Sequence, residues 1–260
     1  MEHQFLTILV PLLTAHVAGD FLTQSDEDIR RKNQPRVLIK HVLKVGLLSY
    51  LLLGLPAAWE LVLGTTISHG LVDALKVRSK KGTYLSRFFL DQGVHVIILL
   101  LFSWTAARYQ YHGTVSIWGA LFGLAYYRAL VLGAGTVLCV YVGNFVVEHT
   151  FQSLQALEEK DVENSSIREQ SPQAWRHFGL AEGGRVIGYL ERSLILVFVL
   201  AGQPAGIGFL LAAKSIFRFG ELTDSTRRRQ AEYIIIGTLM SFLFGTAAAY
   251  TTAAVLTILK

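Results

Sequence analysis

The sequence predicts an all-α membrane protein, a polytopic bundle of about eight transmembrane helices with its N-terminus outside. Hydrophobic residues make up 52% of the 260 residues and charged residues only 17%, a balance too apolar for an ordinary soluble domain. Apolar runs of about 20 residues, the length that crosses the hydrocarbon core of a bilayer, recur along the whole chain. Together these observations favour the bilayer as the solvent of the fold.

The predicted spans follow one another along the chain, separated by short joints that carry basic residues or glycine and proline. The first span lacks the basic leader of a signal peptide, and we expect it to be retained. The fifth is too long for one straight crossing, which leaves a tilted helix, a break near 133–135 or an extension into the cytoplasm. The spans are predicted at about 4–24, 37–55, 57–77, 86–107, 118–148, 184–202, 205–220 and 230–258.

Basic residues orient these spans because they gather in alternating joints. They are Arg30, Arg31, Lys32, Arg36, Arg78, Lys80, Lys81, Arg87, Arg227, Arg228 and Arg229. Cytoplasmic loops carry the excess of lysine and arginine in membrane proteins, so these joints are predicted to be cytoplasmic and the N-terminus to be outside. The same joints account for the net charge of +5, and nucleic acid is not an expected partner.

Composition also divides the chain. Residues 1–150 form a membrane half rich in histidine and aspartate, 151–183 a polar cytoplasmic linker, and 184–260 a second membrane half with charged residues inside its spans. The single cysteine, Cys139, excludes an internal disulfide framework and a cysteine-rich metal site, and we expect it to pack in the core.

Histidines and aspartates in the first four predicted spans share one spacing and one depth. Three His/Asp pairs have partners four residues apart, which places each pair on one helix face. A further histidine lies at matching depth, and all of these residues fall toward the cytoplasmic ends of their spans. We therefore expect seven side chains to meet in one layer: His16, Asp20, His41, His69, Asp73, Asp91 and His95.

This layer is best explained by a metal. Ionisable side chains at membrane depth are costly unless they have partners or line a functional path. Neutral imidazoles and ionised carboxylates cannot neutralise one another, whereas a divalent cation satisfies both. We predict one or two divalent ions, zinc first and manganese or iron as alternatives. A proton relay or ion path built from the same residues is the competing interpretation.

Polar neighbours of the layer are expected to orient the ligands or to contact a substrate; they are Gln24, Ser68, Lys76 and Gln92. In the second half, Lys214 and Arg218 share a helix face. They predict either a buried ion-pair network that locks helices together or a substrate-binding clamp for a phosphate or carboxylate headgroup.

Residues 15–24 (AHVAGDFLTQ), His41, the stretch from Ser68 to Asp73 and residues 90–95 (LDQGVH) carry a family resemblance that covers about residues 5–105. Through them the sequence resembles the bacterial membrane proteins catalogued as domain of unknown function 3307. The second half is similar to the C-terminal part of longer members. The resemblance implies a multi-pass protein of the bacterial inner (plasma) membrane. A looser similarity, to inner-membrane proteins described as metal-dependent hydrolases, implies hydrolysis.

The expected function is that of a metal-dependent hydrolase acting at the cytoplasmic leaflet on a lipid or lipid-linked ester or phosphoester, with Asp91 as the general base and membrane lipid as a partner. A cation or proton transporter using the same residues, and a metal-stabilised membrane scaffold, remain open. Transport predicts polar residues that continue across the membrane, but the first four spans are mostly apolar outside the layer. That asymmetry favours a one-sided site.

Overall fold

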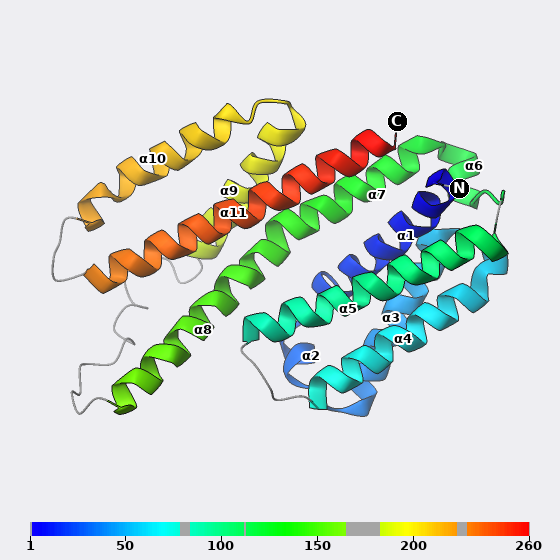
Figure 1. The fold of residues 1–260 in the computed structure, drawn as a ribbon, viewed down its shortest axis with the longest axis horizontal. Helices are drawn as coiled ribbons and strands as arrows, with labels where there is room; N and C mark the ends of the chain where they lie inside the picture. The colour runs from blue at the N-terminus through cyan, green and yellow to red at the C-terminus, as the bar shows by residue number, and fades with distance from the viewer. Residues whose placement is uncertain (1, 79–83, 112, 165–182, 223–227, 260) are drawn as a thin grey trace. The chain divides into compact units, whose positions relative to one another are not determined.

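The computed structural model describes residues 2–78, 84–111, 113–164, 183–222 and 228–259, and the regular structure of this part of the chain is entirely helical (Figure 1). The predicted all-α class is confirmed. In chain order the elements are α1 (Glu2–Phe21), α2 (Asp26–Arg30), α3 (Pro35–Leu53), η1 (Pro56–Ala58), α4 (Trp59–Arg78), α5 (Tyr84–Thr105), η2 (Ala106–Gln110), α6 (Ile117–Phe122), α7 (Leu124–Val137), η3 (Leu138–Val142), α8 (Gly143–Asn164), α9 (Gly183–Leu200), α10 (Ala205–Leu222) and α11 (Arg228–Ile258).

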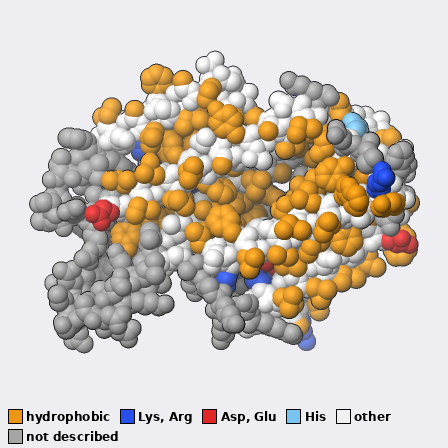
Figure 2. Space-filling model, in the orientation of Figure 1, with side chains coloured by type: hydrophobic (Ala, Val, Ile, Leu, Met, Phe, Trp, Pro, Cys, Tyr) orange, Lys and Arg blue, Asp and Glu red, His pale blue; other side chains and the backbone are white. Residues whose placement is uncertain are grey.

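Four helical stretches are long and apolar enough to cross a membrane: His3–Phe21, Leu85–Tyr109, Leu124–Ser153 and Glu232–Ile258. Hydrophobic side chains also spread over the face shown in Figure 2. Leu43 on α3 and Leu75 on α4, for example, are 64% and 65% exposed. Surfaces of this kind are unfavourable in water and are covered by lipid in a membrane protein. The remaining predicted spans correspond to α3, α4, α9 and α10, whose crossing of the bilayer stays a prediction.

The long fifth segment is interrupted, but not where the sequence suggested. Gly123 ends α6 with a φ of 58°, a conformation that favours glycine. From Leu124 the chain is continuously helical to Asn164, and residues 133–135 lie inside α7. The irregularity in this stretch is the π-helical turn η3 at Leu138–Val142. The segment is therefore extended, and the predicted 151–183 linker begins within α8, while its residues 165–182 lie outside the described part.

Residues 1–137 and 254–260 form one compact unit. In it α1 packs against α3, α5 and α7, and α4 packs against both α3 and α5. The buried residues that join these helices are Ile8, Leu9, Leu12, Leu53, Ala58, Leu61, Val62, Leu99, Ala106 and Ala107. Burying apolar side chains between these helices holds α1, α3, α4 and α5 in one bundle.

Residues 138–253 form the second unit. Here α9 packs against η3, α8 and α10. Its core contains Cys139, Ile195, Leu196, Val199, Phe242 and Ala249. The Cys139 thiol is buried and donates to the carbonyl oxygen of Arg192 at 3.2 Å, in keeping with a packing role.

Candidate metal centre

The structure brings all seven predicted ligand residues together in the first unit, from α1, α3, α4 and α5. Each of the four histidines and Asp91 is 5% exposed or less, Asp73 is fully buried, and the side chain of Asp20 is 7% exposed. Donor atoms of three subsets lie within 4.8 Å of one another: His16, Asp20 and His69; His41, His69 and Asp73; and Asp73, Asp91 and His95. The expected convergence of four helices on one layer is present.

Four of the seven form a tight centre. The Nε2 atoms of His41 and His69 are 3.0 Å apart. Asp20 Oδ1 lies 3.2 Å from the first of these nitrogens and 3.5 Å from the second. Asp73 Oδ2 lies 3.3 and 3.4 Å from the same two nitrogens. We call Asp20, His41, His69 and Asp73 the inner set.

These distances are in the range found between ligand atoms that share one metal ion. Ligand atoms at about 2.0 to 2.1 Å from a tetrahedral zinc are separated from one another by about 3.3 to 3.4 Å. Five of the six edges of the inner set are known, and they run from 3.0 to 3.5 Å. The donors, two imidazole nitrogens and two carboxylate oxygens, are those that divalent zinc, manganese and iron accept. The donor types and the five separations fit one divalent cation shared by the inner set.

Proton counting leads to the same conclusion. Each neutral imidazole has one N–H, yet His41 Nε2 faces His69 Nε2 and a carboxylate oxygen from each of two aspartates. One proton cannot bridge three acceptors. Asp20 Oδ1 is buried without a hydrogen bond from any described residue. Clustered electron pairs of this kind repel one another unless a cation lies among them.

Three further residues, His16, Asp91 and His95, adjoin the inner set. The rings of His16 and His95 stack with their centroids 4.9 Å apart, and the ring of His95 lies 4.5 Å from that of His69. Nδ1 of His95 is 2.9 Å from the carbonyl oxygen of Asp91, so the ring proton belongs on Nδ1. That leaves a lone pair on His95 Nε2, which is buried without a hydrogen bond from any described residue.

Gln92 connects α5 to α1. Its Oε1 is 3.2 Å from His16 Nε2, and its amide nitrogen donates to Asp20 Oδ2 at 3.1 Å and to Asp91 Oδ2 at 3.2 Å. One uncharged side chain thus orients one imidazole and two carboxylates. This arrangement is what the sequence analysis expected of a supporting residue.

The other supporting candidates behave differently. Lys76 Nζ lies 2.6 Å from Asp91 Oδ2 and forms an ion pair with it. Ser68 donates to the carbonyl oxygen of Gly64, in its own helix, at 2.8 Å. The Nε2 of Gln24 is buried without a hydrogen-bond partner among the described residues. Lys76 therefore contacts the cluster, while Ser68 bonds to its own helix backbone.

Sequence reasoning missed Lys32, which it assigned to the cytoplasmic charge of the first joint. Its Nζ lies 2.9 Å from Asp73 Oδ2, and its side chain is only 11% exposed. Lys32 follows α2, whose start is capped reciprocally by Ser25 and Asp28. Hydrogen bonding to the backbone and the side chain of Ser25 lowers the pKa of the Asp28 carboxyl below its ordinary value. Spacing gives no signal for such a contact, because Lys32 reaches the site from a joint and not from a predicted span.

Small residues allow the helices to approach at this layer. A Cβ added at Gly19 would lie 2.6 Å from Val45 Cγ2 of α3, and one added at Gly46 would lie 2.7 Å from Thr66 Oγ1 of α4. A real Cβ atom essentially never lies this close to another heavy atom, so both positions require glycine for the observed packing. Since Gly19 directly precedes Asp20, the close approach also places a ligand.

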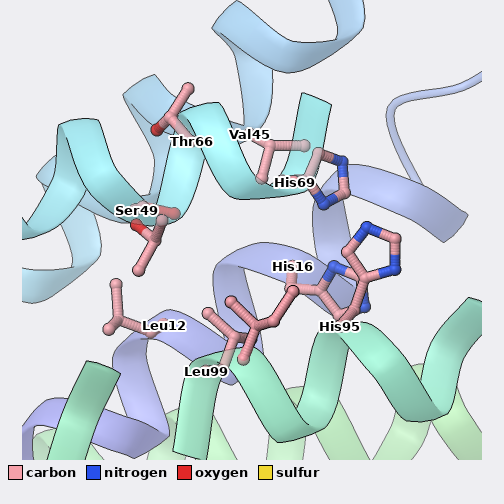
Figure 3. Close-up of a pocket in the computed structure, with 10 residues that line it drawn as sticks. Leu12, His16, Val45, Ser49, Thr66, His69, His95 and Leu99 are labelled. Carbon is pink, nitrogen blue, oxygen red and sulfur yellow. The ribbon is translucent and has the colours of Figure 1, made fainter. Parts of the chain in front are cut away.

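A small pocket adjoins the centre, with the rings of His16, His69 and His95 gathered at one end of it and Leu12 and Ser49 toward the other (Figure 3). Its volume is about 10 Å³, which is room for about one water molecule. The lining residues are Leu12, His16, Val45, Ser49, Thr65, Thr66, His69, His95, Ile98 and Leu99.

The predicted substrate cations lie in the second unit. Lys214 Nζ is 2.5 Å from Glu191 Oε2, and both side chains are largely buried. This contact is an ion pair of the kind that the sequence analysis weighed against a headgroup clamp. Arg218 lies in α10, but its side chain is outside the described residues. A third cation, Arg192, is 1% exposed and was not singled out as a site residue.

Comparison with known protein families gives a match to part of the chain. The model of a family described as protein of unknown function (DUF3307) matches residues 8–118, a segment that contains all seven ligand candidates. No curated protein and no solved structure matches the chain. The looser similarity to metal-dependent hydrolases stays a prediction.

Proposed function

We propose a function from the centre itself, because residues 8–118 belong to the DUF3307 family, whose description assigns no activity. The chain is a membrane-embedded metalloprotein with one divalent cation, zinc in first place, held by Asp20, His41, His69 and Asp73. Manganese and iron accept the same donors and are the alternatives. The observation that carries this proposal is the set of five inter-donor distances between 3.0 and 3.5 Å.

The reaction we propose is hydrolysis of an ester or phosphoester of a lipid or lipid-linked molecule at the cytoplasmic leaflet. Hydrolysis requires the metal to take a water as a fifth ligand beside the four donors of the inner set, and that water would have a lowered pKa at neutral pH. His95 Nε2 carries a lone pair and lines the water-sized pocket beside His69, so it is suited to accept a proton. Asp91 is already engaged by Lys76 and Gln92. We therefore propose His95 as the general base, with Asp91 holding it through the backbone contact at Nδ1.

Elemental analysis of the purified full chain tests the metal. We expect about one zinc per chain, and loss of that zinc in Asp73→Asn. His95→Gln, in contrast, should keep the metal. A chain without stoichiometric metal, or an Asp73→Asn variant that retains it, contradicts the proposal.

Activity is tested separately, with fluorogenic carboxylic esters and phosphoesters in detergent micelles. Zinc-dependent turnover by the wild-type chain should be lost in His95→Gln while its metal content stays unchanged. A loaded chain that hydrolyses none of these substrates contradicts the hydrolase proposal and leaves the metal centre standing.

A second candidate is a cation or proton path. The observation that favours it is enclosure: Asp73 is fully buried, and the adjoining pocket admits about one water molecule. Flux of Zn²⁺ or of protons into proteoliposomes distinguishes the two functions. Flux that is abolished by Asp20→Asn supports transport, and its absence in a metal-loaded chain excludes it. A chain that binds metal tightly but shows neither ion flux nor hydrolytic turnover would be a metal-stabilised scaffold, which needs no open coordination position.

We also propose that eight helices cross the bacterial inner membrane, with the N-terminus outside and a cytoplasmic segment at 151–183 between two membrane halves. The alternating basic joints support this topology. In a Cys139→Ala background, Ala57→Cys in the turn before α4 should react with an impermeant maleimide added to intact cells. Arg31→Cys in the first joint should react only after the cells are lysed. If Arg31→Cys reacts in intact cells and Ala57→Cys reacts only after lysis, the N-terminus lies in the cytoplasm and the proposed orientation is wrong.

A further inference from the structure

The second unit contains a cavity of about 440 Å³, in the size range of small-molecule sites. It is bounded by α8, α9, α10 and α11. Two of these helices, α8 and α11, lie within stretches apolar enough to cross a membrane. The lining is nonetheless rich in polar and charged groups, which include Asn144, Arg185, Glu191, Arg192, Lys214 and Ser241.

Arg192 is the buried charge of this cavity. It is 1% exposed, and its Nε and Nη2 donate to the carbonyl oxygen of Val140 at 3.2 and 3.0 Å. Its Nη1 donates to Ser241 Oγ at 2.8 Å. Val140 belongs to the π-helical turn η3, where the usual i to i+4 bonding is interrupted and a carbonyl becomes available to a side chain. The guanidinium is thus held by a fixed backbone acceptor.

The side chain is also held sterically. A Cβ on Gly143 would lie 2.6 Å from Arg192 Cδ, and a Cβ on Gly188 would lie 3.1 Å from its Nη1. The Arg192 guanidinium carbon lies 5.8 Å from the ring centre of Tyr189. Because these neighbours already hold the Arg192 side chain, it loses little further conformational entropy when the guanidinium binds a ligand.

Charge neutralisation of Arg192 is incomplete. No carboxylate among the described residues forms an ion pair with it, and the neighbouring Glu191 is paired with Lys214 at 2.5 Å. A guanidinium has five N–H groups, and the hydrogen bonds of Arg192 use one each on Nε, Nη1 and Nη2. One N–H on each terminal nitrogen is left. A buried cation without a counter-ion is costly, and an anion in the cavity would remove that cost.

We propose that this cavity binds a phosphate-bearing anion. Arg192 is the principal ligand, since its two remaining terminal N–H groups can donate in parallel to two phosphate oxygens. Lys214 supplies a second positive charge. Glu148 and Glu191, which also line the cavity, limit the affinity by their negative charges. The anion is either the headgroup of an anionic phospholipid or free phosphate. This site is independent of the metal centre.

Binding to the full chain in detergent tests the proposal, with phosphatidylglycerol followed by native mass spectrometry and inorganic phosphate by isothermal titration. We expect one of these anions to bind, and Arg192→Gln to weaken it about tenfold or more. Glu191→Gln should strengthen binding about threefold or more, because a like charge is removed from the cavity. Arg128→Gln, which removes an exposed arginine of α7 in the first unit, is the charge-matched control and should change nothing.

The variant Glu191→Gln keeps the test decisive even where Arg192→Gln does not fold, since misfolding does not raise affinity. Binding of phosphatidylglycerol alone identifies a lipid headgroup as the source, and binding of phosphate alone identifies a soluble anion. Binding of neither anion overturns the proposal. So does a Glu191→Gln variant whose affinity falls, because that result would mean that the carboxylate supports binding of the anion and does not oppose it.

Discussion

The Nε2 atoms of His41 and His69 face each other across 3.0 Å, with one carboxylate oxygen of Asp20 and one of Asp73 within 3.5 Å of both. Without a metal, one neutral imidazole can donate from Nε2 to Nε2 of the other, and neither ring then has a further Nε2 proton for the two carboxylate oxygens. With a divalent cation between them, both imidazoles are neutral and all four atoms act as donors to the ion. If the proposed metal binds, the inner set is more stable loaded than empty, and each of the first two predictions depends on this difference.

Removal of the metal should destabilise the protein. A cation present at about a thousandfold excess over its Kd contributes about 4 kcal/mol to the free energy of unfolding, so a chelator should lower the Tm clearly. Thermal unfolding of the wild-type chain with and without chelator measures the effect. Asp73→Asn serves as the control, since it has no metal to lose. An equal response of both chains would contradict a resident metal.

Metal affinity should fall as the pH is lowered. Zinc binds neutral imidazole and ionised carboxylate, so protons compete with it for His41 and His69. Each histidine that must lose a proton weakens binding by up to about tenfold per pH unit once it is protonated. Competition with a chromophoric zinc indicator at pH 7.5 and pH 5.5 measures the change. An affinity that stays constant would exclude histidine ligands.

Gly19→Ala should reduce metal content because its methyl group would clash with Val45 and separate α1 from α3, which carry Asp20 and His41. Gly93→Ala is the matched control: it lies in α5 beside Gln92, but its Cβ meets nothing within 4 Å. Elemental analysis of both variants should show metal loss in the first alone. Equal retention would mean that the close approach of the two helices is not required.

Lys32→Met should tighten metal binding. The ammonium group of Lys32 lies 2.9 Å from Asp73 Oδ2 and repels a divalent cation at the same oxygen. We expect an increase in affinity of about threefold or more in the indicator assay. Lys32→Arg keeps the charge and should bind metal as the wild type does. A weaker Lys32→Met would show that the lysine instead positions the carboxylate.

Gly143→Ala should destabilise the second unit, because the added methyl group would lie 2.6 Å from Arg192 Cδ and 3.2 Å from Phe244 Cδ1. Overpacking of this kind costs about 1–3 kcal/mol. Gly133→Ala, in α7 of the same continuous helix, meets nothing within 4 Å and should be neutral or slightly stabilising. Thermal unfolding of the two variants tests the contrast, and similar Tm values would contradict it.

Helical periodicity and span depth were sufficient to predict that the seven His and Asp residues meet. Spacing placed each pair on one helix face, and loop charge placed the pairs at one end of their spans. Depth defines a layer but not the rotation of each helix about its axis, so the sequence could not separate the inner set from His16, Asp91 and His95. The contact of Lys32 with Asp73 depends on the path of a joint, which has no periodicity to interpret.

The second unit was less predictable for a related reason. The charged residues of α9 and α10 were visible in the sequence, but their pairing depends on which helices pack together. The π-helical turn at Leu138–Val142 has no simple sequence signature, and it is this turn that supplies the acceptor for Arg192. A break at 133–135 was one of three alternatives for the fifth segment, beside a tilted and an extended helix. Residues 133–135 lie inside α7, and the chain breaks at Gly123.

The amide of Gln92 has a chemical consequence for the whole centre. By accepting from His16 Nε2 it assigns that proton, and by donating to Asp20 and Asp91 it stabilises the ionised form of both carboxylates. The carbonyl of Asp91 likewise assigns the proton of His95 to Nδ1. The interior of the centre then offers only electron pairs, while the ammonium groups of Lys32 and Lys76 lie at its edge. Such an arrangement, with electron pairs inside and positive charges at the edge, is expected to repel anions and to favour cations of high charge density.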